Sequence, residues 1–199
     1  MNRPYLIGLT GSIGMGKSTT AEMFADAGAA VWDADAAVHR LYKSGGAAEA
    51  PISDLCPASK TVLGIDRGVL KQWIQKDPTA LGRIEKVVHP LVAADRADFI
   101  KSTDADIVIL DIPLLFETGV EAQFDMIVVV STSGEAQKQR VMARAEMTAI
   151  QFDTILAKQI PDAEKRKRAD VVIDTTSHET AQAGVRRVMQ RAIQGRTHA

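Results

Sequence analysis

The sequence predicts an α/β protein built on a doubly wound, five-stranded parallel sheet that carries a helical insertion. Short runs rich in β-branched residues alternate with longer amphipathic stretches, which is the pattern of βαβ units around a buried parallel sheet. About 70 residues separate the second run from the third. One crossover needs only about 12 residues, so the extra length indicates an inserted segment.

Five apolar runs are expected to form the strands. They span Tyr5–Thr10, Ala30–Asp33, 106–111, Met126–Ser131 and 170–174. The long interval after the second run defines a helical insertion over residues 36–103, and residues 1–35 and 104–199 then form the core. Within the insertion, residues 44–64 are rich in Gly, Ala, Pro and Ser and give the weakest structural signal.

Capping residues place the first helix boundaries. A helix over residues 17–27 is predicted to end at Gly28, because glycine readily adopts the left-handed conformation that closes many helices. Asp77 is expected to cap a helix whose first residue is Pro78, where the missing N–H does no harm.

Two further helices are predicted in the last third of the chain. Thr148 and Gln151 have the spacing of a capping box, and the helix behind them should run towards Gln159. Near the C-terminus, a helix capped by Ser177 should bury one apolar face. That face consists of Ala181, Val185, Val188, Met189, Ala192 and Ile193.

Composition excludes several classes of protein. The 199 residues include 24 Lys and Arg against 25 Asp and Glu, so the basic excess of bulk nucleic-acid or membrane-surface binders is missing. Aromatic residues make up only 5%, too few for a base-stacking platform. Cys56 is the one cysteine, and no apolar run approaches the roughly 18 residues of a membrane span. We therefore expect a cytoplasmic protein that acts on small molecules and binds neither nucleic acid nor membranes. A monomer is the expected state, and an oligomer stays open.

A phosphate-binding loop is the most informative motif. Gly11-Ser12-Ile13-Gly14-Met15-Gly16-Lys17-Ser18 matches G-x-x-x-x-G-K-[ST] and lies between a predicted strand and a predicted helix, as in P-loop NTPases. Its glycines let backbone N–H groups approach phosphate oxygens, and the helix directs its positive end at them. We expect Lys17 to reach the β and γ phosphates and Ser18 to bind Mg²⁺. The other expected nucleotide contacts are Gly11, Gly14, Met15, Gly16 and Thr19. The alternative is a glycine-rich turn with an exposed lysine.

The loop by itself leaves three classes of nucleotide-binding protein open. A GTPase normally reads guanine with N-K-x-D, but the only asparagine is Asn2. An ABC-type ATPase would carry L-S-G-G-Q, which the sequence lacks. A small-molecule kinase needs an acceptor-side base and mobile cationic groups besides the loop, and the sequence offers candidates for both.

Acidic residues follow two of the predicted strands. Asp33 ends the second strand, where ligands of open α/β sheets bind, and is expected to orient an acceptor hydroxyl and take its proton. Asp35 is expected to cap the next helix; alternatively, both carboxylates make only local turn hydrogen bonds. Asp111 follows four apolar residues at the end of the third strand, a Walker-B-like pattern that favours a Mg²⁺ ligand.

Other candidates have competing interpretations. The apolar run after Pro113 could form a wall beside the acceptor or a buried structural loop. Arg140 and Arg144 lie four apart on one helix face, where they could neutralise a transferring phosphoryl group or form a solvated face. His89 is either a capping or packing residue or a site residue. The basic run at 165–168 is interpreted as a solvated helix surface.

Taken together, these segments resemble the dephospho-CoA kinase family, and the resemblance spans nearly the whole chain. It rests on the phosphate-binding loop, on Asp33-Ala34-Asp35, on Val88-His89-Pro90-Leu91-Val92, on Asp111-Ile112-Pro113-Leu114-Leu115-Phe116-Glu117 and on the two arginines. The run from Lys165 to Asp174 continues it. Two places depart from the family pattern: Thr175 stands where the family usually has Asn, and residues 44–64 match poorly.

The resemblance implies ATP-dependent phosphorylation of the ribose 3′-hydroxyl of dephospho-CoA, with Mg²⁺. It implies that Asp33 is the catalytic base and acts with Lys17 and Arg140, and that Arg140 and Arg144 belong to a lid over about residues 140–168. The implied acceptor contacts are Asp33, His89, Pro113, Leu114, Leu115 and Glu117. The implied metal ligands are Ser18 and Asp111, and the insertion would bind the acceptor.

Two other functions remain open from the sequence. A kinase of the shikimate or gluconate type also combines the phosphate-binding loop with D-x-D after the second strand, although the glycine triplet of shikimate kinases is missing here. A regulatory module would bind nucleotide and a protein partner without transferring phosphate.

Overall fold

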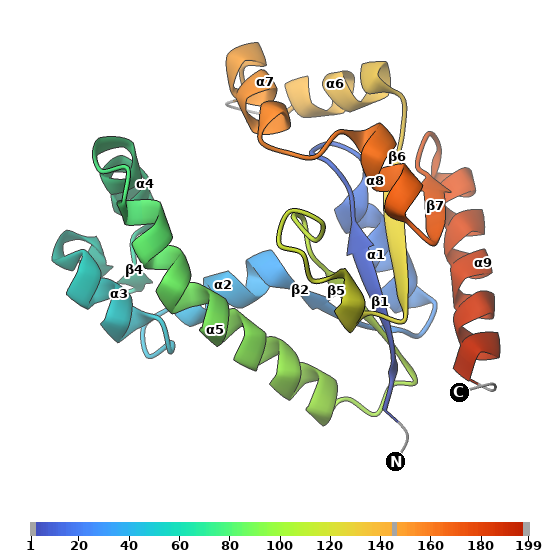
Figure 1. Cartoon of the computed structure of the whole chain (residues 1–199), viewed down its shortest axis with the longest axis horizontal. Coiled ribbons are helices and arrows are strands. Elements are labelled where there is room, and N and C mark those ends of the chain that lie inside the picture. The colour runs from blue at the N-terminus through green and yellow to red at the C-terminus, as the bar shows by residue number, and fades with distance from the viewer. Residues whose placement is uncertain (1–2, 145–146, 197–199) are drawn as a thin grey trace. The chain divides into compact units, whose positions relative to one another are not determined.

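A computed structural model describes residues 3–144 and 147–196, and its central element is a five-stranded sheet (Figure 1). The strand order is β2-β5-β1-β6-β7. The strands are β1 (Tyr5–Thr10), β2 (Ala30–Asp33), β5 (Ile107–Asp111), β6 (Met126–Ser131) and β7 (Val171–Asp174). The pairs β1–β5, β1–β6 and β6–β7 are parallel. The predicted fold class is therefore confirmed, and each predicted strand is correct to within one residue.

The chain divides into two compact units. The first, which we call the core unit, comprises Met1–Trp32 and Asp104–Ala199. The second, the insert unit, comprises Asp33–Thr103. In the described part of the chain, no helix is both long and apolar enough to cross a membrane.

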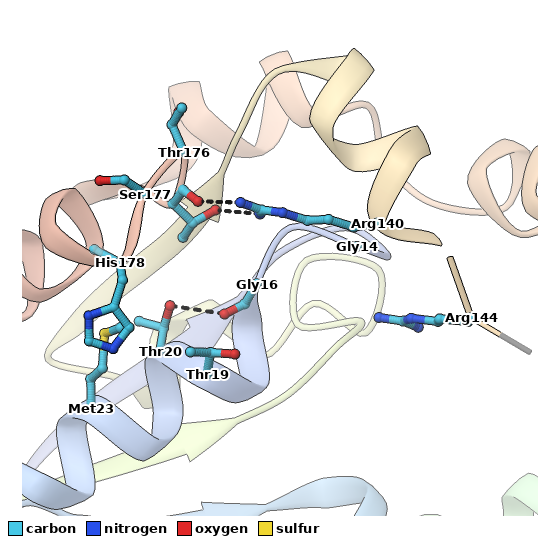
Figure 2. A pocket seen from close by; sticks show the side chains of 12 residues that line it. Gly14, Gly16, Thr19, Thr20, Met23, Arg140, Arg144, Thr176, Ser177 and His178 are labelled. Carbon is cyan, nitrogen blue, oxygen red and sulfur yellow. Dashed lines mark hydrogen bonds between the residues drawn. The ribbon is translucent and has the colours of Figure 1, made fainter. Parts of the chain in front are cut away.

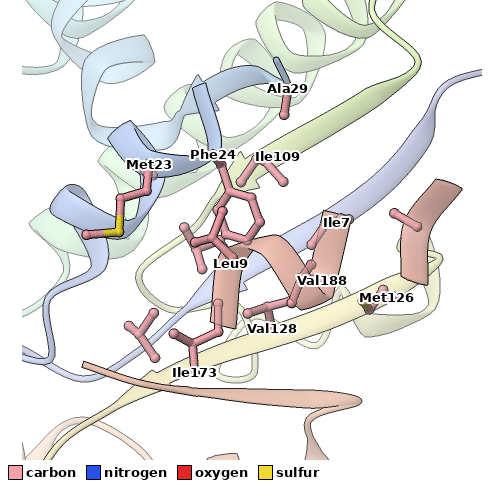
Figure 3. Packing of buried hydrophobic residues seen from close by; sticks show 14 of the residues in the cluster. Ile7, Leu9, Met23, Phe24, Ala29, Ile109, Met126, Val128, Ile173 and Val188 are labelled. Atoms are coloured by element: carbon pink, nitrogen blue, oxygen red, sulfur yellow. The ribbon is translucent and has the colours of Figure 1, made fainter. Parts of the chain in front are cut away.

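The core unit buries the sheet on both faces, which is why β5 and β6 are buried along their whole length. Its helices are α1 (Lys17–Asp26), α6 (Gly134–Met142), α7 (Ala149–Ala157), α8 (Asp162–Arg168) and α9 (His178–Arg196), and a short 3₁₀ turn, η2, spans Glu121–Gln123. Alternate residues of β6 face opposite ways. Met126 and Val128 join residues of α1 and α9 in the main cluster (Figure 3), whereas Ile127 belongs to a second cluster with Leu115.

Most predicted helix ends in the core unit are confirmed. Gly28 has φ of +92°, as a left-handed C-terminal residue should. Thr148 and Gln151 form the complete capping box, and α7 then ends at Ala157, just before Gln159. The side chain of Ser177 accepts a hydrogen bond from the Thr180 amide at the start of α9. The predicted apolar face was wrong at one residue, because Ile193 is 57% exposed.

The insert unit is helical with one small hairpin. Its elements are α2 (Ala34–Tyr42), α3 (Glu49–Leu55), η1 (Pro57–Ser59), β3 (Lys60–Thr61), β4 (Gly64–Ile65), α4 (Arg67–Lys76) and α5 (Ala80–Ser102). Side chains of α2, α3, α4 and α5 share one apolar cluster. The predicted start of α5 was wrong by two residues, because the Asp77 carboxylate holds the Thr79 amide in a turn that contains Pro78, and the helix begins at Ala80.

Candidate active site

The phosphate-binding loop joins β1 to α1 in a conformation that requires glycine. Gly14 and Gly16 have φ of +78° and +86°, a region that residues with a Cβ atom rarely adopt. No side chain caps the N-terminus of α1. The first amides of α1 and the positive end of its dipole are therefore directed at the space beside the loop, which is the arrangement that binds phosphate.

Lys17, the first residue of α1, forms an ion pair with Asp111 at the end of β5. The two side chains are 15% and 1% exposed. The sheet explains the encounter, because Asp111 is paired in register with Leu9, two residues before the loop. The ion pair brings together two residues that the sequence assigned to phosphate and to metal.

A divalent cation fits the groups at this place. Asp111 supplies a carboxylate and Ser18, the next residue of α1, supplies an exposed hydroxyl. Both are oxygen ligands of the kind that Mg²⁺ prefers.

A pocket of about 340 Å³ opens beside the loop (Figure 2). Met23 and Ala181 supply an apolar part of its lining, and hydroxyl groups, His178 and two arginines supply most of the rest. The lining residues are Gly14, Gly16, Thr19, Thr20, Met23, Arg140, Arg144, Thr175, Thr176, Ser177, His178 and Ala181. A pocket that combines a small apolar patch with several polar groups, beside a phosphate-binding loop, suits the base of a nucleotide.

Thr175 connects this pocket to the loop. Its buried hydroxyl donates to the Met15 carbonyl at 2.7 Å. Arg140 in turn donates to the Thr175 carbonyl at 2.6 Å and to its hydroxyl at 3.3 Å (Figure 2). The residue that departs from the family pattern thus holds both the loop and the arginine, while Arg144 lines the same pocket with an exposed side chain.

The segment after Asp111 is anchored at several points. Thr10 donates a hydrogen bond to the Pro113 carbonyl at 3.2 Å. Leu115 is fully buried and lies so close to β1 that a Cβ on Gly8 would be 2.6 Å from its Cδ1 atom. Leu114, by contrast, is 43% exposed.

Glu117 is held by an ion pair and by a hydrogen bond. Lys165 Nζ lies 2.9 Å from its Oε1 atom, and the Ile160 amide donates to the same oxygen at 2.9 Å. Burial by itself would raise the pKa of Glu117, but the hydrogen bonds from Lys165 and Ile160 outweigh it, so the pKa lies below its ordinary value. The carboxylate therefore stays charged and ties this segment to α8.

The basic run at 165–168 is a solvated surface at Arg166, Lys167 and Arg168, as predicted, but the prediction was wrong for Lys165. Lys165 is fully buried, and Arg168 lies 4.4 Å from the ring centre of Phe116 and pairs with Glu121. Lys165 and Arg168 are one helical turn apart, so both reach the segment that follows Asp111. Their acidic partners, Glu117 and Glu121, are four residues apart, but nothing in the sequence connects them to a basic run more than 40 residues away.

In the insert unit, Asp33 rather than Asp35 caps α2. The Asp33 Oδ1 atom accepts a hydrogen bond from the Ala36 amide at 2.7 Å, whereas Asp35 is exposed in the first turn, so the predicted cap was wrong. His89 lies exposed within α5, one residue before Pro90, and is not a capping residue.

The parallel sheet, the glycine loop at the head of α1 and the paired Lys17 and Asp111 define a P-loop nucleotide-binding protein. Comparison with known proteins narrows the class. The family model described as dephospho-CoA kinase matches residues 5–181, and the chain belongs to this family.

Relatives and solved structures agree with the family. Curated dephospho-CoA kinases from Cereibacter sphaeroides and Ruegeria pomeroyi are each 55% identical to this chain; the first match covers 92% of this chain and 93% of the relative, the second 98% and 99%. A Thermus thermophilus crystal structure is similar with a TM-score of 0.86 and 32% identity, over 96% of this chain and 98% of that one. The dephospho-CoA kinase from Campylobacter jejuni, at 23% identity and a TM-score of 0.69 over the same shares, is similar in fold.

Proposed function

We propose that this chain transfers the γ-phosphoryl group of ATP to the ribose 3′-hydroxyl of dephospho-CoA, which gives coenzyme A and ADP and completes coenzyme A synthesis. The observation that carries the proposal is the ion pair of Lys17 and Asp111 at the head of α1. It sets a cation and a metal-binding carboxylate where the phosphates of a nucleotide would lie. Membership of the dephospho-CoA kinase family supplies the acceptor.

The nucleotide would be held by the core unit. We assign its phosphates to the loop amides and Lys17, and its adenine to the pocket beside Met23 and Ala181. Gly11, Gly14, Met15, Gly16, Ser18 and Thr19 complete the assigned nucleotide contacts. Ser18 and Asp111 would hold Mg²⁺, which when bound neutralises charge on the β and γ phosphates.

The acceptor would be bound with the help of the insert unit. Asp33 ends β2, and ligands of such sheets bind at the carboxyl ends of the strands. We assign the proton of the 3′-hydroxyl to the Asp33 Oδ2 atom, because Oδ1 already accepts the Ala36 amide. We also assign acceptor contacts to His89, Pro113 and Leu114. Leu115 is fully buried and Glu117 is paired with Lys165, so we assign these two to support of the segment instead of the acceptor contacts that the resemblance implied.

The reaction would be an in-line displacement. The 3′-oxygen forms a bond to the γ-phosphorus as its proton passes to Asp33, the bond from that phosphorus to the bridging oxygen breaks, and ADP leaves. Positioning and charge stabilisation supply most of the rate enhancement in such transfers. Arg140, with Arg144, would contribute cationic donors from a lid over about residues 140–168; in the structure, the Arg140 guanidinium donates to the Thr175 carbonyl.

An assay of ADP release with a panel of acceptors tests the proposal. The panel is dephospho-CoA, shikimate, gluconate, nucleoside monophosphates and no acceptor. We expect release that depends on dephospho-CoA. Activity confined to shikimate or gluconate would identify the other kinase type, and nucleotide binding without acceptor-dependent release would indicate a regulatory module. The single cysteine supports a cytoplasmic location, and the near-balanced charge supports the absence of nucleic-acid and membrane partners. We also propose that the protein is a monomer.

A further inference from the structure

Two glutamine side chains form hydrogen bonds with the backbone of one residue of the phosphate-binding loop. The two glutamines lie at opposite ends of the segment 137–159. Gln137, on α6, donates its side-chain amide to the Ile13 carbonyl at 2.7 Å. Gln159, two residues after α7, accepts a hydrogen bond from the Ile13 amide at 3.1 Å through Oε1. Both backbone polar groups of Ile13 are therefore satisfied by side chains that flank residues 138–158.

The two contacts have opposite hydrogen-bond polarity, and the backbone dictates which is which. A carbonyl can only accept, so Gln137 must present its NH₂ group; an amide N–H can only donate, so Gln159 must present its oxygen. The orientation of each side-chain amide is thus fixed by chemistry. Gln137 is 5% exposed, so its hydrogen bond is shielded from competing water.

The loop also packs directly on α6. A Cβ on Gly14 would lie 2.5 Å from Val141 Cγ2 and 3.0 Å from the Gln137 carbonyl oxygen. The loop and the second half of α6 therefore approach each other as closely as glycine permits, and the Gln137 side chain bonds the neighbouring residue of the loop. No pattern in the sequence signals this, because the partners are backbone atoms more than 120 residues away.

We propose that Gln137 and Gln159 are positioning residues that fix the peptide groups on either side of Ile13 for binding the phosphates of ATP. A loop that binds phosphate through its amides gains affinity when those amides are held in place beforehand. Gln137 and Gln159 hold the loop amides and directly precede and follow residues 138–158. The position of that segment and the geometry of the loop are therefore coupled. The proposal rests on the nucleotide-binding part of the proposed function.

Matched glutamate variants test the predicted polarity. Gln137→Glu and Gln159→Glu each place one carboxylate beside the same loop residue, at a buried position for residue 137 and at a half-buried position for residue 159. Only Gln137→Glu loses its hydrogen bond, because a carboxylate accepts but does not donate. We expect it to raise the Kd for ATP·Mg²⁺, measured by calorimetry, about tenfold more than Gln159→Glu does. Equal effects of the two variants would overturn the proposal.

Methionine variants provide a second, uncharged arm. Gln137→Met and Gln159→Met keep the side-chain length and remove both hydrogen bonds, and each should raise the Kd and KM for ATP about three- to tenfold. The KM for dephospho-CoA should stay within about twofold, which a general loss of structure would not produce. Gln190→Met, at an exposed position of α9, is the control. If one Gln137 variant does not fold, Gln159→Met still decides: a wild-type Kd for ATP would overturn the proposal.

Calorimetry separates this proposal from the function on which it rests. If the wild-type protein binds ATP but releases no ADP with any acceptor, the proposed reaction fails while the comparison of Kd values between variants still tests the two glutamines.

Discussion

Lys165 Nζ lies 2.9 Å from Glu117 Oε1, and the lysine side chain has no exposed surface. Lys165→Met keeps the side-chain length and leaves a carboxylate that is only 15% exposed without its cationic partner. Breaking a buried pair in this way typically costs about 3–5 kcal/mol of the free energy of unfolding. Urea unfolding followed by circular dichroism measures the loss.

The same helix provides a matched control for this prediction. Lys167 pairs with Glu164, but these side chains are 70% and 53% exposed. Lys167→Met should therefore change the free energy of unfolding by less than about 0.5 kcal/mol. Similar losses in the two variants would show that the buried pair has no special role.

The pH dependence of stability follows from the lowered pKa of Glu117. Because its folded pKa lies below the unfolded value of about 4.3, the carboxylate stabilises the fold above that value, and this stability is lost as the pH falls through the folded pKa. The wild-type protein should lose more unfolding free energy than Glu117→Gln between about pH 6 and about pH 3. Urea titrations across this range would refute the assignment if the two proteins showed the same slope.

Asp33→Asn separates catalysis from folding. Asparagine caps a helix as well as aspartate does, so α2 should be retained, whereas the amide cannot accept the acceptor proton. We expect kcat to fall by about 10²- to 10⁴-fold at saturating substrates, with little change in the thermal midpoint. Asp66→Asn makes the same change at the N-cap of α4 and should leave kcat unaltered. Near-normal turnover of Asp33→Asn would mean that another group is the base.

Gly8→Ala tests the packing of Leu115 against β1. The added Cβ would lie 2.6 Å from Leu115 Cδ1 and 3.1 Å from the Phe124 ring. Overpacking of this kind costs about 1–3 kcal/mol, and displacement of the segment should raise the KM for the acceptor more than that for ATP. Gly82→Ala meets nothing within 4 Å in α5 and should stabilise the protein by about 0.4–1 kcal/mol. Thermal unfolding measures the stability of each variant, and steady-state kinetics measures its KM values. Equal changes in the two variants would contradict the close packing of Leu115 on Gly8.

Thr175 is expected to act through its hydroxyl. Thr175→Val keeps the shape of the side chain but removes the donor to Met15, leaving a carbonyl of the loop without this bond. We expect a loss of about 1–2 kcal/mol in unfolding free energy together with weaker ATP binding. Thr175→Ser retains the hydroxyl and should restore both. If the serine variant were no better than valine in ATP titrations, the hydroxyl would not be the source of the effect.

The strands of the core unit could be predicted because each is a continuous apolar run whose signal is local. The hairpin of β3 and β4 could not, since each strand has only two residues and the turn depends on a tertiary contact. Gly64 has φ of +113°, and a Cβ there would lie 2.1 Å from the Tyr42 carbonyl oxygen. The composition of residues 44–64 gives no information about that contact.

The residues of the candidate site also fall into those that the sequence could indicate and those that it could not. The phosphate-binding loop is contiguous in the sequence and carries its chemistry in its own backbone, so roles for its lysine and serine could be proposed from the motif. The burial of Lys165 could not be predicted, because charge and spacing describe an exposed helix until its partner, Glu117, is placed beside it. Gln137 escaped notice for a similar reason, as its partner is the backbone of Ile13.

The site of phosphorylation on the acceptor is the most direct test of the proposed reaction. Dephospho-CoA, ATP and Mg²⁺ are incubated with the protein, and the product is identified by mass spectrometry and phosphorus NMR. The proposed reaction predicts one added phosphoryl group, on the ribose 3′-oxygen, in equal amount to the ADP released. Phosphorylation at any other oxygen, or ADP release without a phosphorylated acceptor, would contradict it.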